Sequence, residues 1–156
     1  MYPVLFLDID GCLNSAETFR DPYALLIGTH AGHRVDPKMV ARLDQVLDAT
    51  GAKVVVSSSW RCGDEGQTVA QRLARAGFRH AGDVIGETSR LDGIRGMEIG
   101  AWLLDHPDVS TFAILDDDDD MGNHRARLVQ TTWELGLQDE HVASLVALLL
   151  NQPYFD

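Results

Sequence analysis

Val4-Leu5-Phe6-Leu7-Asp8-Ile9-Asp10-Gly11 sets two carboxylates after a short apolar run, and two later stretches of the chain have the same design. They are Val54-Val55-Val56-Ser57 and Phe112-Ala113-Ile114-Leu115-Asp116-Asp117. Short runs of β-branched and aromatic residues are typical of strands buried on both faces, as in parallel sheets. Because parallel strands end at the same edge of a sheet, we expect Asp8, Asp10, Ser57 and the Asp116-Asp117 pair to lie together there. Such a cluster suits a hard cation and a phosphoryl group.

The rest of the chain alternates apolar runs of strand length with segments of helical periodicity. Asp36-Pro37 predicts the start of a helix, and Gly51 predicts its end. The pattern predicts further helices at about 65–76, from Arg95 to His106 and after a capping Asp139, and strands at 53–57, 84–86, 111–115 and 128–131. This alternation predicts an α/β fold of three layers with a mostly parallel central sheet.

The length of 156 residues predicts a single domain, 1–156, large enough to bury one core without disulfides or metals. The stretch 13–35 shows no clear periodicity, and we expect it to be irregular. It is longer than most connections inside compact domains, and loops of that length are often functional. We therefore expect 13–35 to form a flap or a minimal cap loop.

The formal charge of −11 argues against broad affinity for nucleic acid, which needs Lys and Arg to neutralise phosphates. It does not exclude an enzyme that binds one terminal phosphate. No apolar stretch approaches the roughly 20 residues that span a bilayer, and no basic segment precedes an apolar one at the N-terminus. We therefore expect a cytoplasmic protein without membrane contact, with Cys12 and Cys62 as reduced thiols. The lack of four Cys or His at zinc spacing argues against structural zinc.

These motifs, in this order, resemble those of the haloacid dehalogenase (HAD) superfamily of phosphohydrolases. Asp8-Ile9-Asp10-Gly11 is similar to the first motif, DxDG, and Ser57 to the second. Arg95-Gly96-Met97-Glu98 lies where the third motif places a cation at a helix start, more often Lys, and Asp116-Asp117 resembles the fourth. The segments LFLDIDGCLN, VVVSSSWR, RGMEIGAWL, AILDDDDDM and RLVQTTWELGL resemble more closely the HAD domain of the "Swiss Army Knife" RNA-repair proteins. The resemblance implies a Rossmann-like HAD fold with at most a minimal cap.

The hydrolysis of a phosphate monoester gives these side chains distinct candidate roles. A catalyst must neutralise the phosphoryl oxygens, attack in line and protonate the leaving group. Asp8 could attack phosphorus and form an aspartyl-phosphate, while Asp10 could protonate the leaving oxygen and later deprotonate the hydrolytic water. Ser57 could donate a hydrogen bond to the phosphoryl group, and Arg95, or alternatively Arg90, could hold it with a guanidinium.

Mg²⁺ is the expected cofactor, because it binds oxygen ligands through one or two carboxylates plus a substrate phosphate. The candidate ligands are Asp8, Asp116, Asp117 and Asp120, with the carbonyl of Asp10 completing the set in the family pattern. The candidate substrate contacts are Gly11, Ser58 and Arg61; the last resembles an Arg that follows the second motif in polynucleotide phosphatases. We expect Trp60 to pack in the core rather than to stack on a base.

The leading hypothesis is a Mg²⁺-dependent phosphatase that acts on terminal phosphates of RNA or DNA. The short stretch 13–35 leaves room for a bulky substrate, and the RNA-repair resemblance favours a polynucleotide end. The alternatives are a small-metabolite or phosphoprotein phosphatase of the same fold, and a non-catalytic regulatory or binding module. A two-component receiver is disfavoured because it carries its phosphoacceptor Asp where this chain has Ser57. None of these patterns indicates an oligomeric state.

Overall fold

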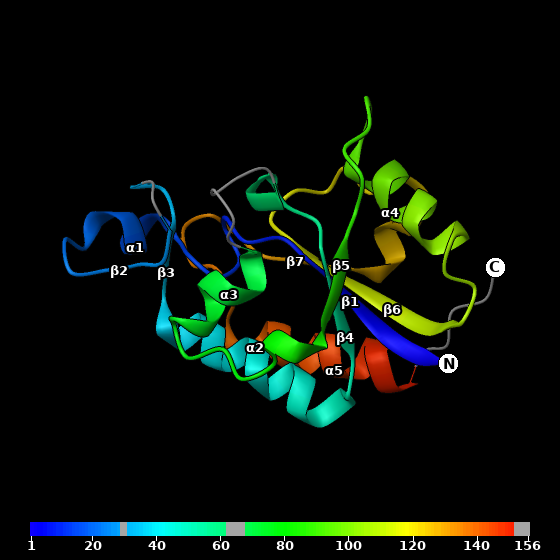
Figure 1. The fold of residues 1–156 in the computed structure, drawn as a ribbon, viewed down its shortest axis with the longest axis horizontal. Coiled ribbons are helices and arrows are strands. Elements are labelled where there is room, and N and C mark those ends of the chain that lie inside the picture. Colours follow the sequence, from blue (N-terminus) through cyan, green and yellow to red (C-terminus); the bar gives the residue numbers. More distant parts are fainter. Residues whose placement is uncertain (29–30, 62–67, 152–156) are drawn as a thin grey trace.

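The computed structural model describes residues 1–28, 31–61 and 68–151, and a five-stranded sheet lies at its centre (Figure 1). The strands, in the spatial order β5-β4-β1-β6-β7, are β5 (Val84–Glu87), β4 (Lys53–Val56), β1 (Tyr2–Leu7), β6 (Val109–Asp116) and β7 (Leu128–Gln130). Each pair of neighbours in this sheet is parallel. The predicted fold class is confirmed, and these strands lie where the sequence predicted them.

Helices cover both faces of the sheet. Side chains of β1 alternate between the faces, as the pleat of a strand requires. Leu5 and Leu7 belong to a core shared with α2 (Pro37–Thr50), α3 (Val69–Ala74) and α5 (Asp139–Asn151). Val4 and Phe6 belong to a second core shared with α4 (Arg95–Leu104), which packs beside the 3₁₀ helix η3 (Gly122–Arg127). One core lies between each face of the sheet and the helices that cover it, so the chain has the three layers of the predicted fold.

The predicted helix ends agree in most places with the structure. Asp36 caps α2 by accepting a hydrogen bond from the Lys38 amide at 2.9 Å, and Gly51 ends it with φ of 67°. Asp139 is the first residue of α5 rather than its cap. Helix α3 begins at Val69 after Thr68, and residues 62–67, where we predicted its first turn, lie outside the described residues. Across the described parts of the chain, no helix combines the length and apolar character required to cross a bilayer.

The prediction that 13–35 is irregular is wrong in part. The stretch contains α1 (Ala16–Arg20) and a two-stranded antiparallel sheet of β2 (Leu25–Leu26) and β3 (Arg34–Val35). A helix this short shows no periodicity in sequence, and it depends on a local cap in which the Ser15 amide donates to Thr18 Oγ1 at 3.0 Å. Figure 1 shows these elements beyond the end at which β1 and β6 finish. Their action as a flap stays a prediction.

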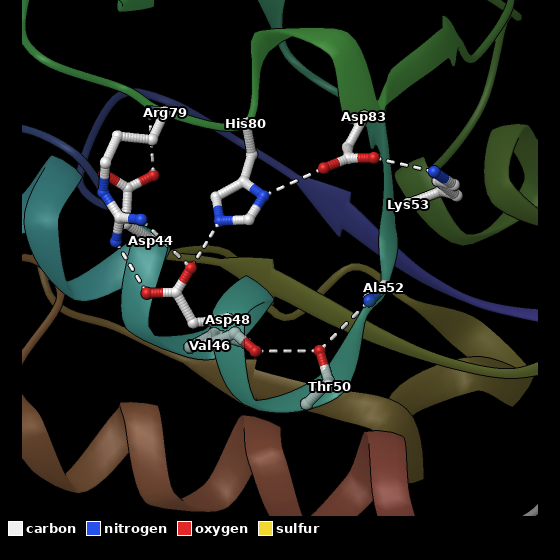
Figure 2. A network of polar contacts seen from close by, with 9 residues as sticks. All are labelled: Asp44, Val46, Asp48, Thr50, Ala52, Lys53, Arg79, His80 and Asp83. Carbon is white, nitrogen blue, oxygen red and sulfur yellow. Dashed lines mark hydrogen bonds and ion pairs between the residues drawn. The ribbon is translucent and has the colours of Figure 1, made fainter.

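A polar network fixes the opposite end of β4 (Figure 2). Asp48, near the end of α2, accepts a hydrogen bond from Arg79 Nη2 at 2.6 Å. The two ring nitrogens of His80 lie 2.8 Å from Asp48 Oδ1 and 2.9 Å from Asp83 Oδ2. Lys53, the first residue of β4, donates to Asp83 at 2.7 Å. The network therefore ties α2 to the segment before β5, far along β4 from Ser57.

Candidate active site

Three carboxylates meet at the edge where the central strands end. Asp8 follows β1, Ser57 follows β4 and Asp116 closes β6, and the paired registers of these strands set them side by side. The Ser57 amide continues the sheet by donating to the carbonyl of Leu7 at 2.8 Å. One ligand atom from each of Asp8, Asp116 and Asp117 lies within 4.8 Å of the others. The parallel topology thus brings together residues that are more than one hundred positions apart.

Burial and mutual repulsion disfavour the ionised form of this cluster. Burial raises the pKa of Asp8 to about 9, and the neighbouring charge of Asp116 adds to the effect while Arg95 opposes it. Burial also raises the pKa of Asp116 to about 6. One guanidinium does not offset the charge of three ionised carboxylates. A further cation between them would restore the ionised forms.

The donor set fits a divalent metal ion. Carboxylate oxygens are the ligands that a hard cation prefers, and Asp8, Asp116 and Asp117 would hold it. Gly11 allows Asp117 to stand in this position, because a Cβ on Gly11 would lie 2.6 Å from Asp117 Cγ. The same glycine has φ of 80°, a conformation that other residues rarely adopt. The glycine of the Asp-x-Asp-Gly motif therefore meets a steric requirement of the site, because a side chain at this position would collide with Asp117.

Arg95 is the cation closest to the cluster among the ion pairs of the described residues. It is the first residue of α4, as predicted, and its Nη1 lies 3.4 Å from Asp116 Oδ2 and 3.8 Å from Asp8 Oδ1. The same nitrogen donates to the carbonyl of Ser57. Buried Glu98, one turn along α4, lies 3.5 Å from Arg95 Nε and orients the guanidinium. Arg90, the alternative, is exposed.

The two serines after β4 have different surroundings. Ser57 is buried, and its hydroxyl has no hydrogen-bond partner among the described residues. A buried polar group without a partner is uncommon, and this hydroxyl can donate a hydrogen bond without breaking an existing one. Ser58 is also buried, but its hydroxyl accepts a hydrogen bond from the Trp60 amide at 3.2 Å. Ser58 therefore supports the local turn, whereas the Ser57 hydroxyl has no such role among the described residues.

Asp10 lies outside the three-carboxylate cluster and has its own supports. Its Oδ1 accepts hydrogen bonds from Asn14 Nδ2 at 2.9 Å and from the indole nitrogen of Trp60 at 3.1 Å. Asn14 also accepts from the Gly11 amide at 2.8 Å, which fixes the turn after β1. Trp60 is buried, as we predicted. These contacts hold one oxygen of Asp10, while its Oδ2 has no hydrogen bond among the described residues.

Asp120 stands at the start of α4 rather than beside Asp8. Its carboxylate accepts a hydrogen bond from the Arg95 amide at 3.1 Å, and its carbonyl accepts from the Gly96 amide at 3.0 Å. Asp120 thereby satisfies amides at a helix start, where a negative charge is favourable. Among the described residues, the group of carboxylates that could hold a metal consists of Asp8, Asp116 and Asp117. Asp120, a candidate ligand from the sequence, is not in this group. The side chain of Arg61 and the whole of Cys62 lie outside the described residues.

The sequence interpretation missed several supporting contacts. Glu98 lies three residues after Arg95 and Asn14 three residues after Gly11, so both could have been found from local spacing. The Trp60 indole and Thr131, whose hydroxyl donates to the Gly11 carbonyl at 2.6 Å, act on residues far away in sequence. No sequence pattern indicates such contacts.

A parallel α/β sheet with an aspartate cluster at its carboxyl edge, faced by an arginine and a serine, is typical of HAD-type hydrolases. Residues 4–142 match the family described as the HAD domain in Swiss Army Knife RNA repair proteins, and the chain belongs to this family. The resemblance stated from the motifs is confirmed. No curated protein gives a significant match to the chain. Membership of the family supports a HAD-type hydrolase in a context of RNA repair, and HAD domains generally use a divalent metal.

Proposed function

We propose that the chain is a phosphomonoesterase in which Asp8 is the nucleophile. The observation that carries this proposal is the group of Asp8, Asp116 and Asp117, whose ligand atoms lie within 4.8 Å of one another at the sheet edge. These residues and the Asp10 carbonyl would hold Mg²⁺, which would neutralise charge on the phosphoryl oxygens.

The phosphoryl group would be held by one protein group after strand β4 and one at the start of helix α4. The Ser57 hydroxyl is buried without a partner among the described residues, so it can donate to a phosphoryl oxygen without breaking an existing bond. Arg95 presents its guanidinium within 3.8 Å of Asp8 Oδ1 and so lies beside the attacking atom. A fixed cation and a fixed donor stabilise the transition state because they need no reorganisation when charge develops.

The reaction proceeds in two steps. A carboxylate oxygen of Asp8 forms a bond to phosphorus, the bond from phosphorus to the leaving oxygen breaks, and that oxygen takes a proton from Asp10. Water then attacks the phosphorus of the aspartyl-phosphate while Asp10 takes its proton, which releases inorganic phosphate and restores Asp8. The Oδ2 of Asp10, which accepts no hydrogen bond from the described residues, is suited to carry this proton, since Oδ1 is held by Asn14 and Trp60.

The substrate we propose is a polynucleotide with a terminal phosphate. The family match to an RNA repair domain supports this choice, and so does the small size of α1 and the β2–β3 hairpin over the sheet edge. The charge of −11 means that few phosphates beyond the terminal one would be bound. Salt should therefore weaken binding only shallowly.

The first experiment measures release of inorganic phosphate with and without Mg²⁺. The panel contains 3′- and 5′-phosphorylated RNA and DNA oligonucleotides, a nucleotide, a sugar phosphate and a phosphopeptide. We expect oligonucleotides to be hydrolysed fastest and excess chelator to abolish release. A sugar phosphate or phosphopeptide hydrolysed much faster would change the substrate class, and no release from any member would favour a binding module.

The second experiment separates the roles of the two motif carboxylates. Asp8→Asn should abolish turnover of every substrate, because an amide is a poor nucleophile. Asp10→Asn should be slow on alkyl phosphates but should still react once with an activated aryl phosphate, whose leaving oxygen needs little acid help. A burst of aryl alcohol and a phosphate on Asp8 in mass spectrometry are then expected. Phosphate found on Asp10 or Ser57 would refute this mechanism.

A further inference from the structure

An exposed pair of aromatic rings lies outside both hydrophobic cores. Phe19 of α1 and Trp133, after β7, stack with ring centroids 5.4 Å apart and an angle of 25° between their planes. Phe19 is 37% exposed and Trp133 41% exposed, whereas Trp60 and Trp102 are at most 9% exposed. Leaving two large rings in water costs free energy that burial would recover. An exposed, ordered aromatic pair therefore suggests a surface that meets a ligand.

The pair is joined to the active site by short stretches of backbone. The Trp133 carbonyl accepts a hydrogen bond from the Ala16 amide at 2.8 Å, which fixes the start of α1. Two residues earlier, Thr131 donates through its hydroxyl to the Gly11 carbonyl at 2.6 Å, and its amide donates to the Asp116 carbonyl at 3.0 Å. Two extended residues span about 7 Å at most, so the backbone of Trp133 lies within about 7 Å of Thr131, which is itself bonded to the backbones of Gly11 and Asp116.

The chemistry of an aromatic surface also suits the charge of this protein. With a formal charge of −11, the chain lacks the excess of Lys and Arg that binds a sugar–phosphate backbone. Stacking on an aromatic ring needs no positive charge, and every base offers a flat face for it. A polynucleotide end could thus be held by its terminal phosphate and its terminal base together.

We propose that Trp133, supported by Phe19, is the platform on which the base of the phosphate-bearing terminal nucleotide stacks. This inference rests on the proposed function and adds a specificity-determining residue to it. It also distinguishes polynucleotide and nucleotide substrates from sugar phosphates, which have no base. The stacking role that Trp60 cannot take, because it is buried and bonded to Asp10, falls to Trp133.

The test is a double-mutant cycle in which a substitution in the enzyme is combined with removal of the base from the substrate. Two phosphorylated oligonucleotides are compared, identical except that the terminal nucleotide of one lacks its base. Wild type should have a KM about tenfold lower for the base-bearing substrate, and Trp133→Leu should lose this preference by raising that KM alone. Trp133→Phe should recover part of it. Leu104→Ala, at an 81% exposed position at the end of α4, is the control and should behave like wild type.

Binding measured without turnover keeps the inference testable even if catalysis is absent. In the Asp8→Asn background, fluorescence polarisation of labelled oligonucleotides should show the same preference for the base and its loss in Trp133→Leu. Equal KM and equal affinity for the two substrates in wild type would overturn the platform while leaving the phosphatase proposal intact. Absence of phosphate release with a preserved, Trp133-dependent preference for the base would overturn the phosphatase proposal alone.

Discussion

Metal-free protein should lose stability as pH rises through the weakly acidic range. The carboxyls of Asp8 and Asp116 have higher pKa values in the folded protein than the ordinary value of 3.8, because burial disfavours their charge. A group of this kind stabilises the fold while it is protonated and ceases to do so as pH rises toward its folded pKa. For Asp116, a rise from 3.8 to about 6 corresponds to about 3 kcal/mol, lost between roughly pH 4 and 6.5.

Asp8, with a pKa of about 9, should continue this loss at higher pH, with a slope of up to about 1.4 kcal/mol per pH unit. The proposed Mg²⁺ would bind the ionised carboxylates of the folded state alone, so it should oppose the loss of stability and stabilise the fold more as pH rises. At one hundred times its dissociation constant it should contribute about 2.7 kcal/mol. Urea denaturation followed by circular dichroism, in chelator and in Mg²⁺ at matched ionic strength, measures both quantities.

Asp116→Asn is the matched variant, because it keeps the shape of the side chain and removes its titration. It should show a shallower fall in stability with pH and little response to Mg²⁺. Against the effect of partial burial, hydrogen bonds to Asp83 and Asp48 raise the pKa of His80, so its network also responds to pH, but it lies at the other end of β4 and should be unaffected by Mg²⁺. Stability independent of pH in chelator, or a Mg²⁺ effect that is equal at low and high pH, would refute the linkage between the cluster and the metal.

Gly11→Ala should weaken Mg²⁺ binding about tenfold or more, because its Cβ would collide with Asp117 and a φ of 80° costs alanine about 1–2 kcal/mol; calorimetric titration measures this, and unchanged affinity would contradict the steric argument. Trp60→Phe removes the indole donor to Asp10 but keeps a ring, so kcat on an alkyl phosphate should fall about tenfold and kcat on an activated aryl phosphate much less. Partial burial lowers the pKa of His80, but its hydrogen bonds to two carboxylates outweigh this and raise it, so the contacts of the charged ring are lost as pH rises through the folded pKa. His80→Gln should therefore destabilise by about 0.5–1 kcal/mol near pH 5.5 and by less near pH 8.5, without changing activity, and equal destabilisation at both pH values would argue against a charged His80.

The strand ends were predictable because two independent signals coincide there. Apolar runs such as Val54-Val55-Val56 indicate buried strands, and the polar residue after each run marks the edge. Helix α2 was predictable from Asp36, Pro37 and Gly51, which act through local backbone chemistry. The short elements in 13–35 were not, because α1 and the β2–β3 pair are stabilised by a local cap and by contacts with distant segments.

The residues of the candidate site also differ in whether their positions could be predicted from the sequence. Strand topology brings Asp8, Ser57 and the Asp116-Asp117 pair together, and this topology could be predicted from the alternation of elements. Arg95 joins them from the start of α4, a helix start that could also be predicted. The selection among the remaining candidates depends on side-chain contacts between distant residues. Asp120, for example, satisfies the first amides of α4 instead of joining the cluster.

Asp8 and Asp10 show how contacts with distant residues give two neighbouring carboxylates different environments. The sequence presents them as two equivalent carboxylates, but β1 ends at Leu7, and Asp10 already belongs to the turn that follows the strand. Asp8 remains buried beside Asp116 and Arg95, where its charge is costly and a cation is needed to stabilise it. Asp10 lies outside the group of Asp8, Asp116 and Asp117 and accepts hydrogen bonds from Trp60 and Asn14. Two carboxylates in such different environments can serve as nucleophile and as proton carrier in one reaction. The turn after β1, held by Asn14 and Gly11, is what separates these roles.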